Sequence, residues 1–382
     1  MKGANTRVLH VITDLQRGGA EAVLEGLVKA SCGRPDIRHS VLCLAGQDHF
    51  NLAGSGIQVN CIGMRPGHPR PSDLSRVRVA IRQSEPSLIH GWMYHGNLAA
   101  WLAGPRHTPL IWSIHHSLHV GARDRWSTRT LIRACAYLSH HHVARLVYCS
   151  EASRAQHEAI GYAGPRAVLI PNGVATDLFH PDDLLRLELR SRLGLSGSDF
   201  LFGFIGRLHP VKNVPGLLQA FSRIHSRSGR LPHLLLAGKG LEPSNPDIAS
   251  LVGGLGVRQR VHLLGERSDV ASVLPALDAY VSFSWSEAFP MSAAEAMACG
   301  VPCVVTDVGD SRRLVGQSGV LVGPGCEHDL ISAMTSLIDA SAERRAEMGN
   351  EARTRVVKLF DLQDIVGRYL SLYVEVAGGS SG

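Results

Sequence analysis

Two carboxylates stand eight positions apart in an otherwise small and apolar stretch, SWSEAFPMSAAEAMACGVPCVVTD, at residues 284–307. Pro290 suits the first turn of a helix and Gly300 suits its end, which predicts a helix that carries Glu295, with Glu287 in the loop before it. A charged side chain on such a helix needs a partner. A carboxylate accepts two hydrogen bonds at once and so suits a pair of ligand hydroxyls, although Glu295 alone is equally explained by solvent or by a nearby arginine.

Two cations follow an apolar run in LFGFIGRLHPVKN, namely Arg207 directly after the run and Lys212 five residues later. Arginine offers bidentate donors and lysine a point charge, and the pair could neutralise a diphosphate. Open α/β sheets place their ligands at strand ends, which favours this role over that of two solvated surface cations.

Gly18 and Gly19 stand between the first apolar run, VLHVI, and a helical pattern. Glycines at a strand-to-helix turn let a phosphate approach bare backbone amides, although a tight turn or helix packing explains the pair equally well. The turn lacks the G-x-G-x-x-G fingerprint of a dinucleotide site.

Short apolar runs alternate with helical patterns along the whole chain, which indicates parallel sheets covered on both faces. We expect two doubly wound, Rossmann-like α/β domains that face a central cleft, with ligands at the carboxyl ends of the strands. The turn signal in IPNGVATDLFHP, followed by an acidic segment poor in helix signals, places the junction after Asn172. The domains are then residues 1–172 and 173–360, and residues 361–376 form a last helix that could pack back on the first domain.

The composition describes a globular chain of 382 residues with 45% hydrophobic and 19% charged residues. No run reaches the ~20 apolar residues of a membrane span, and the N-terminal stretch lacks the features of a secretory signal. The eight cysteines lie mostly inside apolar runs, which indicates reduced thiols of a cytoplasmic protein. Cys299 and Cys303 lack the further ligands of a zinc site, so we expect no metal.

The charge is divided unevenly between the halves. Residues 1–172 carry 19 Lys and Arg against 10 Asp and Glu, a net +9, whereas residues 173–382 carry 20 against 23, a net −3. An anionic partner of the first half is indicated, whether a membrane surface, a phosphorylated substrate or nucleic acid.

Taken together, E-A-F-P-M-S-A-A-E with GRLHPVKN, IPNGV and GGAE in this order resembles the retaining nucleotide-sugar glycosyltransferases of family 4, which have the GT-B fold. The resemblance runs from the first strand to about residue 340. It implies transfer of a hexose from a UDP- or GDP-sugar to a glycan or lipid-linked acceptor with retention of configuration, in polysaccharide or glycolipid biosynthesis. The co-substrate is the nucleotide sugar, and neither a metal nor a further cofactor is implied.

For the donor, the resemblance implies that Glu287 holds sugar hydroxyls and Glu295 the ribose hydroxyls, while Arg207 and Lys212 hold the diphosphate. The backbone from Ala288 through Phe289 and Pro290 to Met291 would lie against sugar and phosphates, and Gly18 and Gly19 would approach from the other domain. Ala288 stands where the family usually has glycine.

The resemblance also implies a histidine near the reacting sugar, which His115 or His116 could supply. The family's Thr-x-His pattern matches Ser113 to His115 and favours His115. The run HGWMYHGN ends another predicted strand and offers four acceptor candidates, with wall packing as the alternative for each: His90, Trp92, Tyr94 and His95.

A basic segment at residues 121–146 suits an anionic lipid surface, and a solvated helix face is its alternative. It contains Arg123, Arg125, Arg129, Arg133 and Arg145 beside Trp126, Leu131 and Ile132. Because many members of the family extend lipid-linked glycans, we expect a peripheral protein on the inner face of the cytoplasmic membrane.

Four other functions fit parts of the pattern. A dehydrogenase would need the missing glycine fingerprint, and a nucleic-acid binder would need a recognition motif that the sequence lacks, so no nucleic-acid partner is expected. A nucleotide-sugar epimerase shares the two-domain fold but needs no acceptor. A non-catalytic sugar-nucleotide-binding protein would differ by the lack of turnover.

Overall fold

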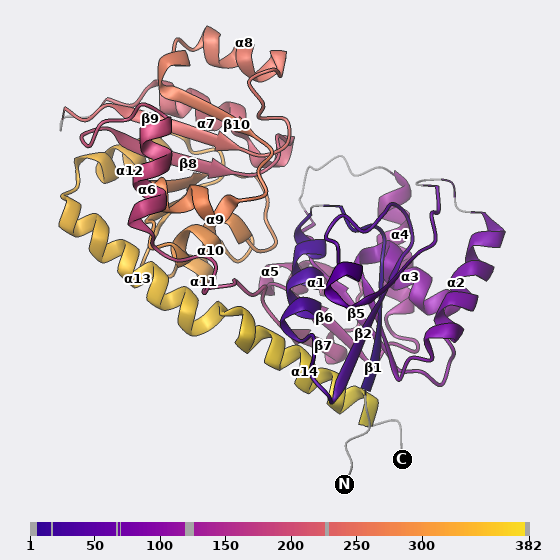
Figure 1. The fold of residues 1–382 in the computed structure, drawn as a ribbon. Coiled ribbons are helices and arrows are strands. Elements are labelled where there is room, and N and C mark those ends of the chain that lie inside the picture. The colour runs from indigo at the N-terminus through magenta and orange to yellow at the C-terminus, as the bar shows by residue number, and fades with distance from the viewer. Residues whose placement is uncertain are drawn as a thin grey trace. The chain divides into compact units, whose positions relative to one another are not determined.

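The computed structural model describes residues 6–16, 18–65, 68, 70–118, 126–225 and 229–378. The chain divides into two units, of which unit 1 comprises residues 1–173 and 362–382 and unit 2 comprises residues 174–361 (Figure 1). The boundary lies within two residues of the junction expected after Asn172. Each unit holds one parallel sheet, and the GT-B type of two Rossmann-like domains predicted from the sequence is confirmed.

Unit 1 contains a seven-stranded sheet in the order β3-β2-β1-β4-β5-β6-β7. Its elements are β1 Thr6–Ile12, α1 Gly19–Ala30, β2 Ile37–Cys43, η1 Ala53–Ser55, β3 Gln58–Cys61, α2 Pro71–Ser84, β4 Leu88–Trp92, α3 Met93–Ala103, β5 Leu110–Ile114, α4 Trp126–Leu138, β6 Arg145–Tyr148, α5 Glu151–Ala159, η2 Gly164–Arg166, β7 Ala167–Leu169 and, from the end of the chain, α14 Leu362–Gly378.

Unit 2 contains a six-stranded sheet in the order β10-β9-β8-β11-β12-β13. Its elements are α6 Asp183–Arg192, β8 Phe200–Ile205, η3 Pro210–Lys212, α7 Val214–Ser222, β9 Pro232–Ala237, α8 Pro246–Gly254, η4 Arg258–Arg260, β10 Val261–Gly265, α9 Val270–Val273, η5 Leu274–Ala276, β11 Ala279–Ser282, α10 Met291–Ala298, β12 Cys303–Thr306, α11 Ser311–Val315, β13 Val320–Val322, α12 Glu327–Asp339 and α13 Ala342–Phe360.

The strands of unit 1 are apolar on both faces because helices cover both faces of the sheet. Val8 and Ile12 of β1 belong to one buried cluster, which residues of α1 and α14 complete. Leu9 and Val11 belong to the opposite cluster, which residues of α2, α3 and α4 complete. The C-terminal helix therefore belongs to the core of unit 1, where Tyr369 and Tyr373 are fully buried.

Each sheet has one point where the strand order reverses, and open α/β sheets bind ligands at the carboxyl end of this point. In unit 1 it lies between β1 and β4, and in unit 2 between β8 and β11. Gly18 follows β1, whereas Arg207 follows β8 and Glu287 follows β11. These residues therefore lie where each sheet is built to hold a ligand.

Four local expectations are corrected. The segment after Pro181 is helical, since Asp182 caps α6 by accepting a hydrogen bond from the Leu185 amide. Pro290 is the N-cap of α10 and Met291 its first residue. The sequence also missed β13, a three-residue edge strand. Fourth, Arg145 does not extend the basic helix but begins β6 and pairs with Glu375 of α14 at 2.6 Å.

Candidate functional site: a donor half-site and a histidine half-site

In unit 2, the expected donor residues gather at the carboxyl ends of β8 and β11. Arg207 is exposed directly beyond β8, and Lys212 ends the short turn η3. Nζ of Lys212 lies 2.5 Å from Oε1 of Glu287, which also accepts a hydrogen bond of 2.8 Å from the Ser284 hydroxyl. One carboxylate oxygen is thus held by a cation and a hydroxyl, which fixes the direction of the Glu287 side chain.

The loop that carries Glu287 is supported from the next strand end. The Asp310 amide donates to the Ala288 carbonyl at 3.2 Å. Gly309 has φ +56, and a Cβ there would lie 2.0 Å from the Glu287 carbonyl oxygen, so only glycine fits. Ala288 has no positive φ, and the loop therefore needs no glycine at this position. The sequence reasoning missed Gly309 and Asp310, although both follow an apolar run, as the other site residues do.

Glu295 lies on α10 and differs from Glu287 in its environment. Its side chain is half-buried among alanines and makes no hydrogen bond or ion pair with the residues that the structure describes. Burial raises the pKa of Glu295 to about 8. Near neutral pH the group is therefore mostly protonated, and acceptance of two hydrogen bonds from a ligand would release this proton.

A third cation at this edge was not expected from the sequence. Lys239 is exposed in the loop after β9, and its carbonyl accepts a hydrogen bond of 2.7 Å from the Leu208 amide. Gly238 precedes it with φ +142, and a Cβ there would meet the Gly206 carbonyl oxygen at 2.1 Å. The two glycines of the AGKG run could have indicated Lys239 from the sequence, because they let this loop approach the Arg207 segment closely.

In unit 1, Gly18 and Gly19 lie at the N-terminus of α1, beyond the carboxyl end of β1. Gly18 is the N-cap and offers no side-chain cap to the first amides of the helix. A Cβ on Gly19 would meet nothing within 4 Å, so packing does not demand a glycine there. A helix N-terminus favours an anion, and the Glu21 carboxylate of the first turn already lies against this one, since its Oε2 would be 2.3 Å from a Cβ on Gly18.

The two histidines after β5 have different partners. Nδ1 of His115 lies 3.0 Å from Oδ1 of Asn172, while its Nε2 is buried and has no hydrogen-bond partner among the residues that the structure describes. Burial lowers the pKa of His115 to about 4, so the ring is neutral. Nδ1 then donates to Asn172, and Nε2 keeps a free lone pair. In His116, by contrast, Nδ1 lies 3.1 Å from the Tyr94 hydroxyl.

The four acceptor candidates do not share one surface. His90 is fully buried, with Nδ1 2.7 Å from the Tyr373 hydroxyl and Nε2 2.6 Å from the Ser113 hydroxyl. Trp92 is also fully buried and stacks on His115 at 5.2 Å between ring centroids. Both therefore pack the wall of unit 1, and neither has an exposed atom for the acceptor contact expected of it.

Tyr94 and His95 lie in the first turn of α3 and differ in exposure. Tyr94 is 4% exposed, and its hydroxyl lies 2.7 Å from Nε2 of His157. His95 is exposed. Of the four acceptor candidates, only His95 has a side chain open to a ligand.

The basic segment is helical from Trp126 to Leu138, and Trp126 and Tyr137 are 81% and 69% exposed. Arg123 and Arg125 lie outside the described residues. Over the described ranges, none of the helices combines the length and apolar composition of a membrane span. The same ranges contain no cluster of three His, Cys, Asp or Glu side chains suited to a metal ion.

Comparisons with known proteins place both halves in glycosyltransferase families. Residues 2–173 match the glycosyl transferase 4-like domain, and residues 199–340 match the glycosyl transferases group 1. The chain is thus a glycosyltransferase with the GT-B fold.

Individual relatives are distant. EpsF of Bacillus subtilis is 25% identical over 98% of this chain and 97% of its own length. The D-inositol 3-phosphate glycosyltransferase of Rhodococcus erythropolis is 31% identical over 70% of this chain and 63% of its own. The crystal structure of Anabaena HepE in complex with UDP and glucose superposes with a TM-score of 0.84 at 22% identity, over 97% of this chain and all of that one.

Proposed function

We propose that the chain transfers a hexose from a nucleotide-sugar donor to a glycan or lipid-linked acceptor, with retention of anomeric configuration. The observation that carries this proposal is the grouping of Arg207, Lys212, Glu287 and Glu295 around the β8–β11 reversal point of unit 2. The donor is a UDP- or GDP-sugar. Structures of HepE with UDP and with UDP-glucose support a nucleotide-sugar donor.

In this proposal Glu295 accepts hydrogen bonds from both ribose hydroxyls, and Arg207 and Lys212 hold the diphosphate. Glu287, already oriented by Lys212 and Ser284, receives hydroxyls of the donor sugar. The backbone of Ala288 to Met291 lies against the sugar and phosphates. Because Lys212 contacts the sugar-binding carboxylate directly, diphosphate binding and sugar orientation are coupled.

The chemistry needs stabilisation of a departing diphosphate that gains charge as the glycosidic bond breaks. Arg207 and Lys212 interact with this charge more strongly in the transition state than in the ground state, which accelerates the step. In this proposal these cations supply the charge that a divalent ion supplies elsewhere, and we expect the reaction to need no metal. A phosphate oxygen of the leaving diphosphate serves as the base for the acceptor hydroxyl.

Unit 1 supplies the other contacts. His115, neutral and oriented by Asn172, lies near the reacting sugar, and the Gly18–Gly19 helix terminus approaches the donor phosphates. His95 contacts the acceptor. The exposed aromatic and basic residues of α4 favour an acceptor at an anionic membrane surface, and we place the protein in the cytoplasm, peripheral to the inner face of the membrane.

A lipid-linked acceptor has support from a relative. The UDP-Gal:alpha-D-GlcNAc-diphosphoundecaprenol alpha-1,3-galactosyltransferase of Escherichia coli is 28% identical over 56% of this chain. Its name describes transfer to a lipid diphosphate. A role in polysaccharide or glycolipid biosynthesis follows for this chain if the acceptor is of the same kind.

The test is product detection by mass spectrometry after incubation with a panel of UDP- and GDP-sugars, with and without lipid-diphosphate and oligosaccharide acceptors. The proposal predicts an acceptor heavier by one hexose residue and release of the nucleoside diphosphate. A donor that is converted to an isomer without any acceptor would indicate an epimerase instead. Binding of the donor without turnover across the panel would indicate a non-catalytic protein.

A further inference from the structure

A second basic site lies in unit 1 at the edge of the sheet opposite Gly18 and His115. It is a cavity of about 700 Å³ at the amino ends of the strands. Arg7 is the second residue of β1, Pro86 precedes β4 and Thr108 precedes β5. The cavity therefore cannot be part of the donor or acceptor site at the carboxyl ends.

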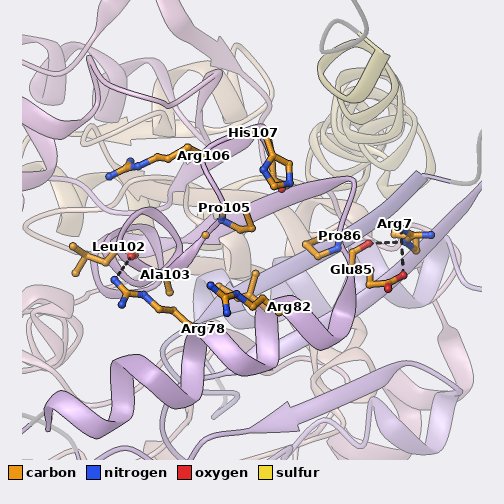
Figure 2. A pocket seen from close by; sticks show the side chains of 13 residues that line it. Arg7, Arg78, Arg82, Glu85, Pro86, Leu102, Ala103, Pro105, Arg106 and His107 are labelled. Carbon is orange, nitrogen blue, oxygen red and sulfur yellow. Dashed lines mark hydrogen bonds and ion pairs between the residues drawn. The ribbon is translucent and has the colours of Figure 1, made fainter.

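Five basic side chains from three elements line this cavity, against one acidic side chain (Figure 2). Arg78 and Arg82 come from the last turns of α2, Arg106 and His107 from the loop before β5, and Arg7 from β1. Glu85 is the acidic residue, and it pairs with Arg7. Nε of Arg7 donates to the Glu85 carbonyl at 2.6 Å, and its guanidinium lies 3.8 Å from the Glu85 carboxylate.

The other three arginines have no acidic partner among the described residues. Arg78 donates to the Leu102 carbonyl at 3.3 Å, and the Arg106 guanidinium lies over the Trp101 ring at 4.4 Å from its centroid. These contacts hold the side chains but leave most of their N–H donors unused, since each guanidinium has five. Arg82 is exposed and makes neither an ion pair nor a side-chain hydrogen bond with the described residues.

The floor between these cations is rigid. Ile81 is fully buried, and Ala103 and Thr108 are 9% exposed. Gly104 lets the chain turn tightly there, because a Cβ would meet the Ala100 carbonyl oxygen at 2.6 Å. The two prolines that line the cavity fix the backbone beside it. The arginines are thus presented from a preformed framework.

We propose that this cavity binds a phosphate group, either free or on the headgroup of an anionic lipid. Arg78 and Arg82 stand four residues apart on α2 and have no carboxylate partner among the described residues, so a bound anion would supply the charge that neutralises them. A planar guanidinium can donate two parallel hydrogen bonds to a phosphate group. The cavity has more guanidiniums than a single carboxylate ligand could pair with, which favours a phosphate. The cavity also gives a location for part of the +9 charge of residues 1–172, which the glycosyl-transfer site leaves unexplained.

The primary experiment titrates inorganic pyrophosphate into the full chain by calorimetry. The pocket variant is Arg78→Gln/Arg82→Gln, and the matched control is Arg38→Gln/Arg65→Gln, which removes the same charge from exposed residues outside the cavity. We expect the pocket variant to lose about tenfold or more in affinity, as for a lost pair of charge-assisted contacts, and the control to lose less than about twofold. Equal affinities of the two variants would overturn the proposal.

Two further arms make the result independent of the donor site and of folding defects. The comparison is repeated in an Arg207→Ala/Lys212→Ala background, where the loss caused by the pocket variant must persist even if the proposed function is wrong. Arg106→Gln, on a different element, must also weaken pyrophosphate binding. If only the α2 variant has an effect, a local change of the helix explains it and the phosphate site is rejected.

The source of the phosphate is decided with vesicles of phosphatidylcholine with and without phosphatidylglycerol. Binding that requires phosphatidylglycerol, is lost in Arg78→Gln/Arg82→Gln and is displaced by pyrophosphate assigns the cavity to a lipid headgroup. Vesicle binding that the pocket variant leaves unchanged, together with its weaker pyrophosphate binding, assigns the cavity to a free phosphate. If neither probe distinguishes the pocket variant from the control, the proposal fails.

Discussion

Glu295 provides the sharpest prediction because its charge state depends on both folding and ligand binding. Burial raises its pKa from the usual 4.5 to about 8. Between these two values the folded protein holds a proton that the unfolded chain releases, so the associated stability is present in full below pH 4.5 and is lost as pH rises through 8. The shift corresponds to about 3 to 5 kcal/mol of unfolding free energy.

The perturbation is Glu295→Gln, which removes the titration and keeps the shape of the side chain. Urea unfolding at pH 5 and pH 9 should show that the unmodified protein loses about 3 to 5 kcal/mol more than the variant over this interval. Glu351→Gln, an exposed glutamate on α13, is the control and should follow the unmodified protein. An identical pH dependence for Glu295→Gln and the unmodified protein would refute the assigned burial of this carboxyl group.

Ligand binding provides a second test of the charge state of Glu295. At pH 7 a group with a pKa of about 8 is mostly protonated, and acceptance of two ribose hydrogen bonds favours the carboxylate. Binding of UDP or GDP should release about 0.9 proton, measurable by calorimetry in buffers of different ionisation enthalpy. Glu295→Ala should remove this release and weaken binding by about 1 to 3 kcal/mol. Proton-neutral binding of unchanged affinity would contradict the ribose assignment.

Three other predictions concern the remaining parts of the site. Asn172→Ala should lower kcat about tenfold while leaving UDP or GDP affinity unchanged, because it frees Nδ1 of His115 and the tautomer is no longer fixed; equal losses in both would point to a general folding defect. Turnover should survive excess EDTA and gain nothing from added Mg²⁺ or Mn²⁺. A dependence on either ion would show that Arg207 and Lys212 alone do not neutralise the leaving diphosphate. Arg123→Gln/Arg125→Gln/Arg129→Gln should reduce binding to anionic vesicles in a salt-dependent way and leave nucleotide binding intact, whereas unchanged vesicle binding would return this segment to a solvated helix face.

The sheets could be predicted from the sequence because parallel strands buried on both faces are continuous apolar runs, such as LFGFIG and VPCVVTD. The strand β13 could not, since it has three residues and pairs only with β12. Helix α6 was missed because its many charges masked a cap at Asp182. Residues that follow strand ends could be placed by the general rule for open sheets, which located Arg207, Lys212 and Glu287 together.

Side-chain direction could not be predicted. His115 follows the end of β5, whereas His90 lies in the middle of β4 and is fully buried, with its Nδ1 2.7 Å from the hydroxyl of Tyr373, 283 residues away in sequence. A contact between residues so far apart in sequence can be identified only when the packing of α14 against the rest of unit 1 is known. The Asn172 contact that distinguishes His115 from His116 also depends on tertiary structure, because it joins the ends of two strands.

The central claim is that the cations beyond β8 hold the leaving diphosphate, and steady-state turnover of matched variants tests it most directly. Arg207→Ala and Lys212→Ala should each lower kcat by about two orders of magnitude or more, as for loss of a transition-state charge partner worth about 2.7 to 4 kcal/mol. Arg258→Ala, an exposed cation before β10 and therefore at the opposite edge of the same sheet, should turn over normally. Normal turnover by both Arg207→Ala and Lys212→Ala would contradict the account and require the diphosphate to bind elsewhere.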